Sequence, residues 1–381
     1  MIQIVLEEYH TKFKEETLEG RYICNDDIEV LISNLSGFFE VEVLGKSIEK
    51  RKIYSLTIGN GPKRILMWSQ MHGNESTTTK ALFDFFKFLN LSPEYSSTIL
   101  NSCTIKIIPI LNPDGAYRYT RENAANVDLN RDAQLVSQPE SAILKSVFES
   151  FKPHFCFNLH GQRTIFSAGK NNKPATLSFL APAQDKALSI TENRKKAMQI
   201  IAYLNTFFQD YIPGQVGIYD DAFNINCVGD TFQKHGVPTV LFEAGHFPND
   251  YNREITRFLI FQAYVLSLNY LALNNLDGKG FETYFEIPKN EKLFYDLIIR
   301  NALVNNHKCD VAIQYQEKLI GNSIEFIPKV MAIEILADFF GHKELDADNS
   351  KVMTANNEEI YGGYENDFVK INNENISLKV N

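Results

Sequence analysis

Segments with the pattern of buried strands alternate with segments that have the pattern of helices along most of this 381-residue chain. Short β-branched apolar runs predict strands, and longer runs with an apolar face predict helices. Strands are expected at residues 38–44, 53–58, 64–68, 104–111, 155–159 and 239–242, and helices at 81–89, 139–151, 185–211 and up to about 275. This alternation predicts an α/β fold with a mixed, mostly parallel sheet flanked by helices.

Four stretches between or before these segments also carry expectations. Residues 1–37 show two short helical patterns. The polar run from Ser76 to Thr79 can cap the helix that follows it. Asn112 to Gly115 has the composition of a turn, and residues 213–228 have that of a loop.

The composition changes after residue 278. Residues 279–381 have the pattern of short strands and turns, and eight of the 33 residues from Asn349 onward are asparagine. We therefore expect two domains, one over residues 1–278 and a small β-rich one over residues 279–381. The second shows no motif that indicates its role.

The net charge of −9 predicts no basic surface, so neither nucleic acid nor an anionic membrane is an expected partner. The longest apolar segment, Phe258 to Leu273, contains Gln262 and Asn269, which suits a buried helix better than a membrane span. Met1 to Glu8 lacks the basic start and cleavage site of a secretory signal. The five cysteines are scattered without a C-x-x-C pair, which predicts neither disulfides nor a thiolate metal site. A cytoplasmic location is expected.

A histidine and a glutamate three residues apart follow the strand expected at 64–68. His72 and Glu75 lie where a strand gives way to a helix, so both side chains can reach one cation. Such a pair alone occurs by chance in many proteins. His160 and Glu243, however, also lie directly at the ends of expected strands. Ligands of open α/β sheets bind beyond the carboxyl ends of the strands, so we expect these residues to converge on one crevice.

Two histidines and one carboxylate on a zinc ion leave a fourth position for water, which is the arrangement of catalytic zinc sites. Zinc lowers the pKa of that water to about 7 and polarises a bound carbonyl. The expected cofactor is therefore one zinc ion.

The motifs, taken in order, resemble the zinc carboxypeptidase (funnelin) family of metallopeptidases, in its bacterial form. They are H-x-x-E at 72–75, N-P-D-G at 112–115, V-D-L-N-R-D at 127–132, L-H-G at 159–161 and F-E at 242–243. The resemblance spans about residues 60–270 and does not extend to residues 281–381. It implies a zinc carboxypeptidase-like catalytic domain over residues 1–278, which hydrolyses the C-terminal amide bond of a peptide.

The resemblance also implies the roles of the metal site and its base. His72, Glu75 and His160 match the three zinc ligands. Glu243 matches the general base, which deprotonates the zinc-bound water and later protonates the leaving amine.

Other residues match the groups that hold the substrate. Asn130 and Arg131 match the pair that binds the terminal carboxylate, a role that suits the planar fork of a guanidinium. Arg121 matches the arginine that stabilises the oxyanion, and Arg118 competes with it for that role. The family also brings a tyrosine from a mobile loop; here that loop holds Tyr219 and Phe223, of which Tyr219 is the choice.

Residues 221–232 are expected to build the specificity pocket, although their preferred side chain cannot be read from the sequence. Asp230 either selects basic residues there or has a structural role. Arg163, three residues after His160, is an extra arginine that is placed to touch a second acidic group on the substrate. The sequence does not indicate an oligomeric state.

Three alternatives remain open. Deacylases of N-acyl amino acids, such as aspartoacylase and succinylglutamate desuccinylase, share the H-G-N-E motif, whereas N-P-D-G and V-D-L-N-R-D favour a peptidase. An R-x-N segment at 121–123 also resembles bacterial enzymes that cut cell-wall stem peptides. A non-catalytic peptide-binding relative is the third. The expected substrate is thus a peptide or a small N-acyl amino acid.

Overall fold

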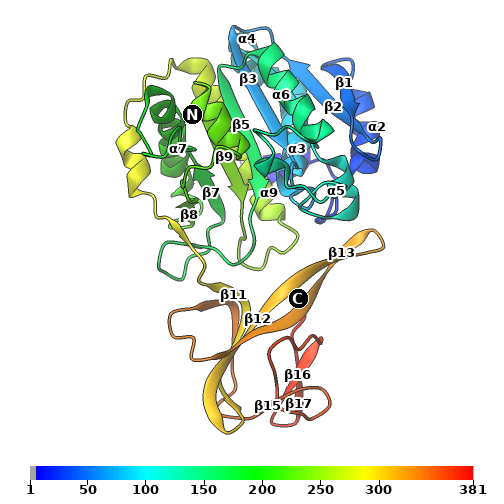
Figure 1. Ribbon diagram of the computed structural model, residues 1–381, viewed down its shortest axis with the longest axis vertical. Helices are drawn as coiled ribbons and strands as arrows, with labels where there is room; N and C mark the ends of the chain where they lie inside the picture. Colours follow the sequence, from blue (N-terminus) through cyan, green and yellow to red (C-terminus); the bar gives the residue numbers. More distant parts are fainter. Residues whose placement is uncertain (1–5, 381) are drawn as a thin grey trace.

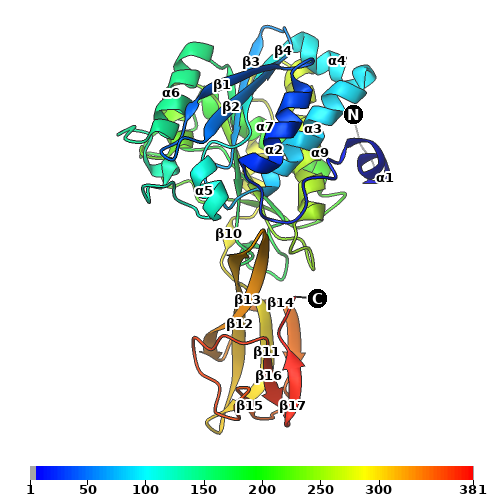
Figure 2. The same cartoon turned by 90° about the vertical axis from the view of Figure 1, so that its right-hand side faces the viewer.

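The computed structural model describes residues 6–380, which form two parts that lie end to end along the long axis (Figure 1). The larger part contains a central sheet with helices on both faces, and the smaller part consists of strands and their connections (Figure 2). Residues 1–5, where the first expected helical pattern begins, lie outside the described residues.

The central sheet has eight strands in the order β1-β2-β4-β3-β5-β9-β7-β8. They are β1 (Glu40–Lys46), β2 (Lys52–Ile58), β3 (Lys63–Ser69), β4 (Cys103–Ile108), β5 (Phe155–Gly161), β7 (Leu177–Leu180), β8 (Val216–Ile218) and β9 (Thr239–Ala244). The pairs β4–β3, β3–β5, β5–β9 and β7–β8 are parallel, and the three other pairs are antiparallel. The predicted α/β fold with a mixed sheet is confirmed, and its parallel centre brings the carboxyl ends of β3, β5 and β9 to one edge.

Helices cover the two faces of this sheet. They are α1 (Leu6–Glu8), α2 (Asn25–Leu35), α3 (Thr77–Leu91), α4 (Pro93–Ser102), α5 (Pro113–Arg118), α6 (Pro139–Phe151), α7 (Glu192–Phe208), α8 (Val228–Lys234) and α9 (Glu254–Leu273), with single turns η1 (Tyr9–Phe13) and η2 (Leu129–Arg131). Successive residues of β3 point to opposite faces, so Ile65 and Met67 join the core under α3 and α9, whereas Leu66 and Trp68 join the core under α6 and α8.

Helix α9 is the only helix among residues 6–380 that is long and apolar enough to cross a membrane by length and composition. However, 83% of its apolar window is buried inside the fold. The prediction of a buried helix for this segment is therefore confirmed, because α3, α4 and α7 all pack against it.

The predicted cap of α3 is wrong. The helix begins at Thr77, and the side chain of Ser76 makes no capping bond, since its hydroxyl donates to the backbone carbonyl of Arg21 (2.5 Å). The hydroxyls of Thr78 and Thr79 lie 2.8 and 2.9 Å from that of Ser69. The polar run thus joins the helix to the end of β3 instead of closing its first turn.

Three other expectations also need correction. Asn112 to Gly115 is not an isolated turn but the start of α5, where the Asn112 side chain accepts from the Gly115 amide (2.9 Å) and Pro113 occupies the first turn. The helix expected at 185–211 begins only at Glu192, because the hydroxyl of Thr191 caps it. The loop expected at 213–228 contains strand β8.

The smaller part contains two sheets. One has the order β13-β12-β11-β14 and the other the order β15-β16-β17. Their strands are β11 (Phe294–Val304), β12 (His307–Ile320), β13 (Ser323–Glu334), β14 (Phe340–Asp346), β15 (Val352–Met353), β16 (Phe368–Ile371) and β17 (Glu374–Ser377). Strands β11 to β13 have 11, 14 and 12 residues, so the expectation of only short strands is wrong. Apolar residues of both sheets form a core of their own.

In the segment of sequence that leads from the larger to the smaller part, η3 (Phe281–Glu286) packs against α7 of the larger part, and β10 (Asn290–Glu291) pairs with its strand β6 (Ser167–Ala168). The expected domain boundary at residue 278 stays a prediction. Side chains also join the parts directly: Gln314 donates to the hydroxyl of Thr164 (2.6 Å), and Arg21 lies 3.0 Å from Glu317.

Candidate active site

Three neighbouring parallel strands place the predicted metal site and base together. His72 lies three residues beyond the end of β3, His160 lies in β5, and Glu243 stands directly opposite His160 in β9. The loop after β3 also packs closely on α5, since a Cβ atom on Gly73 would lie 1.9 Å from the backbone of Gly115. Only glycine allows this close approach, which holds His72 at the edge of the sheet.

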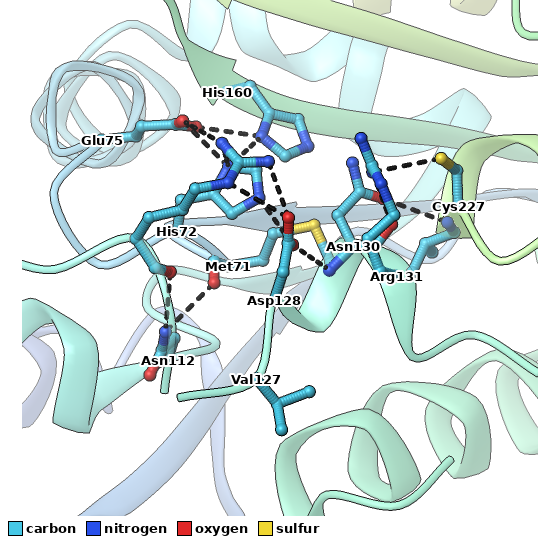
Figure 3. A network of polar contacts seen from close by, with 12 residues as sticks. Met71, His72, Glu75, Asn112, Val127, Asp128, Asn130, Arg131, His160 and Cys227 are labelled. Atoms are coloured by element: carbon cyan, nitrogen blue, oxygen red, sulfur yellow. Dashed lines mark hydrogen bonds and ion pairs between the residues drawn. The ribbon is translucent and has the colours of Figure 1, made fainter. Parts of the chain in front are cut away.

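The side chains of His72, Glu75 and His160 converge on one point (Figure 3). The Nδ1 atoms of the two histidines are 3.1 Å apart, and the Glu75 carboxylate lies 2.8 Å from Nδ1 of His72 and 2.9 Å from that of His160. Both histidines are 2% exposed, so they are held in place by packing as well as by these contacts. The structure thus brings together the three predicted ligands.

Asp128 supports His72 from the opposite side, and the sequence reasoning gave this residue no role. Its Oδ1 lies 3.1 Å from Nε2 of His72 and also accepts from the Asn130 amide (2.9 Å). This contact favours a proton on Nε2 and leaves the Nδ1 lone pair free for a cation. Burial raises the pKa of Asp128, but the hydrogen bonds and charges of His72 and Arg121 outweigh it and hold the pKa below its ordinary value.

Glu243 is a buried carboxyl group beside the three converging side chains. It is 8% exposed, and its Oε2 has no hydrogen-bond partner among residues 6–380. Burial, with the charge of Glu75 adding to it, raises the pKa of Glu243 well above its usual range. A carboxylate whose pKa is raised accepts a proton more readily than an ordinary one, which suits a general base.

Asn130 and Arg131 line a cavity of about 430 Å³ that the three predicted ligands and Glu243 also line, which we call the metal cavity. The Asn130 side chain accepts from the backbone amide of Val228 (3.0 Å), and the Arg131 guanidinium donates to the carbonyl of Asn130 (2.8 Å) and contacts Cys227 Sγ (3.1 Å). No acidic side chain among residues 6–380 pairs with Arg131. Its charge is therefore available to an anion that enters the cavity.

Arg121, not Arg118, reaches the metal site. The Arg121 guanidinium donates to Asp128 (2.9 Å) and lies 3.2 Å from Nδ1 of His72. Arg118 instead forms an ion pair with Glu49 and does not line the metal cavity. Of the two competing arginines, only Arg121 is placed to stabilise charge near the predicted ligands.

Residues 25–205 match the zinc carboxypeptidase family. The chain carries a zinc carboxypeptidase domain. All three predicted ligands fall within the matched residues, whereas Tyr219 and Glu243 lie beyond them.

The curated relatives are distant carboxypeptidases. A probable carboxypeptidase 2 of Trichophyton verrucosum is 27% identical over 114 residues, which are 29% of this chain and 21% of that protein. Human carboxypeptidase D is 25% identical over 233 residues, 52% of this chain and 17% of that protein, and mouse carboxypeptidase M is 28% identical over 181 residues, 39% and 41% of the two. The chain spans about a fifth of the length of the first relatives that it matches.

Solved structures support the fold of the carboxypeptidase domain. A metallo-carboxypeptidase from Burkholderia cenocepacia superimposes with a TM-score of 0.52 at 17% identity, over 65% of this chain and 68% of that one. Carboxypeptidase A from Helicoverpa armigera gives 0.53 at 15% identity, over 66% and 74% of the two chains. The predicted zinc carboxypeptidase-like fold is thus confirmed.

The loop before β9 supplies further residues that line the metal cavity. Tyr219 lines it and packs against Phe166, whereas Phe223 does not line it. Asp230 also lines it but accepts a hydrogen bond from the Asn224 amide (3.1 Å), and burial raises the pKa of Asp230 to about 6. Tyr219 therefore lies at the site. Asp230 lines the cavity and also stabilises the loop through its hydrogen bond with Asn224.

Proposed function

We propose that this protein is a zinc-dependent carboxypeptidase that removes the C-terminal residue of a peptide. One observation carries the proposal: His72, Glu75 and His160 converge beside the buried Glu243, and Arg131 in the same cavity pairs with no acidic side chain of residues 6–380. A metal site, a base and a carboxylate-binding cation in one cavity are what this reaction needs. The carboxypeptidase relatives support the same activity.

The three side chains fit a zinc ion. Tetrahedral zinc with bonds of about 2.0–2.1 Å holds its donor atoms roughly 3.3 Å apart. The closest donor atoms of the three residues are 2.8 to 3.1 Å apart, and two imidazoles with one carboxylate are a common catalytic donor set. Such an ion would supply a Lewis acid and an acidified water at neutral pH.

The residues around this site have separate tasks in the proposed reaction. Glu243 removes a proton from the attacking water and returns it to the leaving amine, as its raised pKa permits. Arg121 stabilises the negative charge that develops on the carbonyl oxygen. Asn130 and Arg131 hold the terminal carboxylate, so that only the last amide bond of a peptide reaches the base. Tyr219, which lines the cavity, contacts the substrate.

A paired substrate panel tests this proposal. Short peptides are offered as free acids and as C-terminal amides, beside N-acetyl and N-succinyl amino acids, to protein loaded with zinc or treated with a chelator. We expect release of one C-terminal amino acid from the free acids only, lost on chelation and restored by zinc. Faster turnover of the N-acyl amino acids would establish a deacylase instead, and absence of turnover by zinc-loaded protein would favour a non-catalytic binding protein.

A further inference from the structure

Four arginines line the metal cavity or a second cavity that adjoins it at Glu75, and these arginines differ in their partners. Arg21 lies 3.0 Å from Glu317, and Arg121 lies 2.9 Å from Asp128, so the protein itself neutralises both. Arg131 and Arg163 have no ion pair with any acidic group of residues 6–380. Arg131 is the residue proposed to bind the terminal carboxylate of the substrate, whereas the proposed function assigns no role to Arg163.

Arg163 lies where the larger and the smaller part of the protein face each other. It follows the end of β5 by two residues and lines the metal cavity as well as a second cavity of about 390 Å³. Side chains of β12 and β13 form much of the wall of this second cavity, among them Gln316 and Met331. The strand-rich part thus borders the metal site directly.

Lys292, which precedes β11, is a second cation without a partner at this position. It lines the metal cavity together with Arg163, and both line a smaller recess of about 180 Å³. Within the described part of the chain, Lys292 forms no ion pair and no hydrogen bond. Arg163 and Lys292, which pair with no acidic group of residues 6–380, are therefore both available to an anionic group, although the protein as a whole has a net charge of −9.

The position of Arg131 fixes the direction in which a peptide runs. Arg131 lines the metal cavity but not the second cavity, whereas Glu75, Arg121 and Arg163 line both. A peptide with its terminal carboxylate on Arg131 and its last amide bond at the metal ligands must continue away from Arg131. It therefore continues toward Arg163 and the second cavity.

We propose that Arg163, assisted by Lys292, binds a second carboxylate of the substrate, on the amino side of the cleaved bond. The inference rests on the proposed function and names its substrate class: peptides with an acidic residue directly before the C-terminal residue. The guanidinium of Arg163 can receive such a carboxylate through two parallel hydrogen bonds. Because Arg163 is exposed, the contribution falls as salt concentration rises.

Binding to an inactive variant tests this inference without turnover. Zinc-loaded Glu243→Gln protein is titrated calorimetrically with two N-acetylated peptides that differ only in Glu or Gln before the last residue. We expect the Glu peptide to bind roughly fivefold more tightly, as one partly exposed ion pair provides. Adding Arg163→Gln should abolish the difference, and Arg163→Lys should retain part of it. Lys170→Gln, which removes an exposed charge of the same part outside the cavities described above, should leave it unchanged.

Equal affinity for the two peptides, or a preference that survives Arg163→Gln, would overturn the inference, as would failure of both peptides to bind. Failure of the proposed function has a different signature: the wild-type protein would bind the Glu peptide selectively and release no amino acid from it.

Discussion

Oδ1 of Asp128 lies 3.1 Å from Nε2 of His72, on the side of the imidazole that faces away from the other two predicted ligands. This contact orients the ring and fixes its tautomer (Figure 3). The same carboxylate also accepts a hydrogen bond from Arg121 (2.9 Å). One side chain outside the predicted set therefore positions both a ligand and the arginine beside it.

Replacing Asp128 should weaken metal binding while the ligands stay in place. In Asp128→Asn, the carboxamide accepts the hydrogen bond of His72 more weakly, and we predict a zinc affinity about 10- to 100-fold lower. Competition with a chromophoric chelator measures it. Asp132→Asn, a control two residues beyond Asn130 in the same motif, should bind zinc as the wild type does, because Asp132 bonds only to residues near its own loop.

Arg131 should be required for free-acid substrates. In Arg131→Gln, the terminal carboxylate loses its charged partner, and we predict a fall in kcat/KM of about 100-fold for free-acid peptides. Arg131→Lys should recover little, because an ammonium lacks the planar fork. The matched control is Arg118→Gln, since Arg118 pairs with Glu49 outside the cavity. A wild-type rate in Arg131→Gln would exclude its assigned role.

The ion pair of Arg21 and Glu317 should stabilise the contact between the two parts. Arg21 is 9% exposed, so Glu317→Gln leaves a largely buried cation without its counter-charge. We predict a loss of about 2 kcal/mol in the free energy of unfolding, measured by urea denaturation. Glu365→Gln removes a carboxylate that pairs with lysines at the surface of the strand-rich part, and it should change stability little. Equal effects of the two variants would show that burial of Arg21 does not matter.

Stability should fall in acid because of His342. Burial lowers the pKa of His342 to about 4, and the charge of Arg253 acts in the same direction, whereas the hydrogen bond to the Thr164 carbonyl opposes it. In the unfolded chain this histidine binds a proton near pH 6.5, whereas in the folded protein it does so only near pH 4. The contribution of neutral His342 to the free energy of unfolding is therefore complete above pH 6.5 and is lost as the pH falls toward 4.

His342→Gln should therefore flatten the dependence of unfolding free energy on pH between 6.5 and 4.5 by about 2 kcal/mol. His307→Gln, at an exposed histidine of the same part, is the control. The ring of the buried His246 contacts that of His342 at a tilted angle, and burial also lowers the pKa of His246, so some dependence on pH remains in both variants. An unchanged slope in His342→Gln would contradict the prediction.

Local sequence patterns predicted the strands and the residues at their ends. The apolar runs that form β3, β5 and β9 are short and bounded by polar residues, which predicted the three strands. Because these strands are parallel neighbours, the residues at their carboxyl ends, His72, His160 and Glu243, lie close together. The contact of Asp128 with His72 could not be predicted in this way, because it joins residues 56 positions apart through a loop. The only signal was that Asp128 stands two residues before Asn130 in a recognised motif.

Contacts between distant segments also explain the wrong predictions. Ser76 is a residue type that often caps helices, but its hydroxyl donates a hydrogen bond to the backbone carbonyl of Arg21 instead. The wall that β12 and β13 form beside the metal cavity depends on how the two parts pack, which no periodicity within residues 279–381 reveals.

The most direct measurement compares wild-type protein with Glu243→Gln, each loaded with zinc and assayed for release of the C-terminal amino acid from a free-acid peptide. The amide has nearly the shape of the carboxylate but cannot accept the proton of the attacking water. We predict that Glu243→Gln binds one zinc ion per chain and loses at least about a hundredfold in kcat. Near-full hydrolysis by Glu243→Gln, or wild-type protein that holds no zinc at saturation, would contradict a zinc carboxypeptidase with Glu243 as its base.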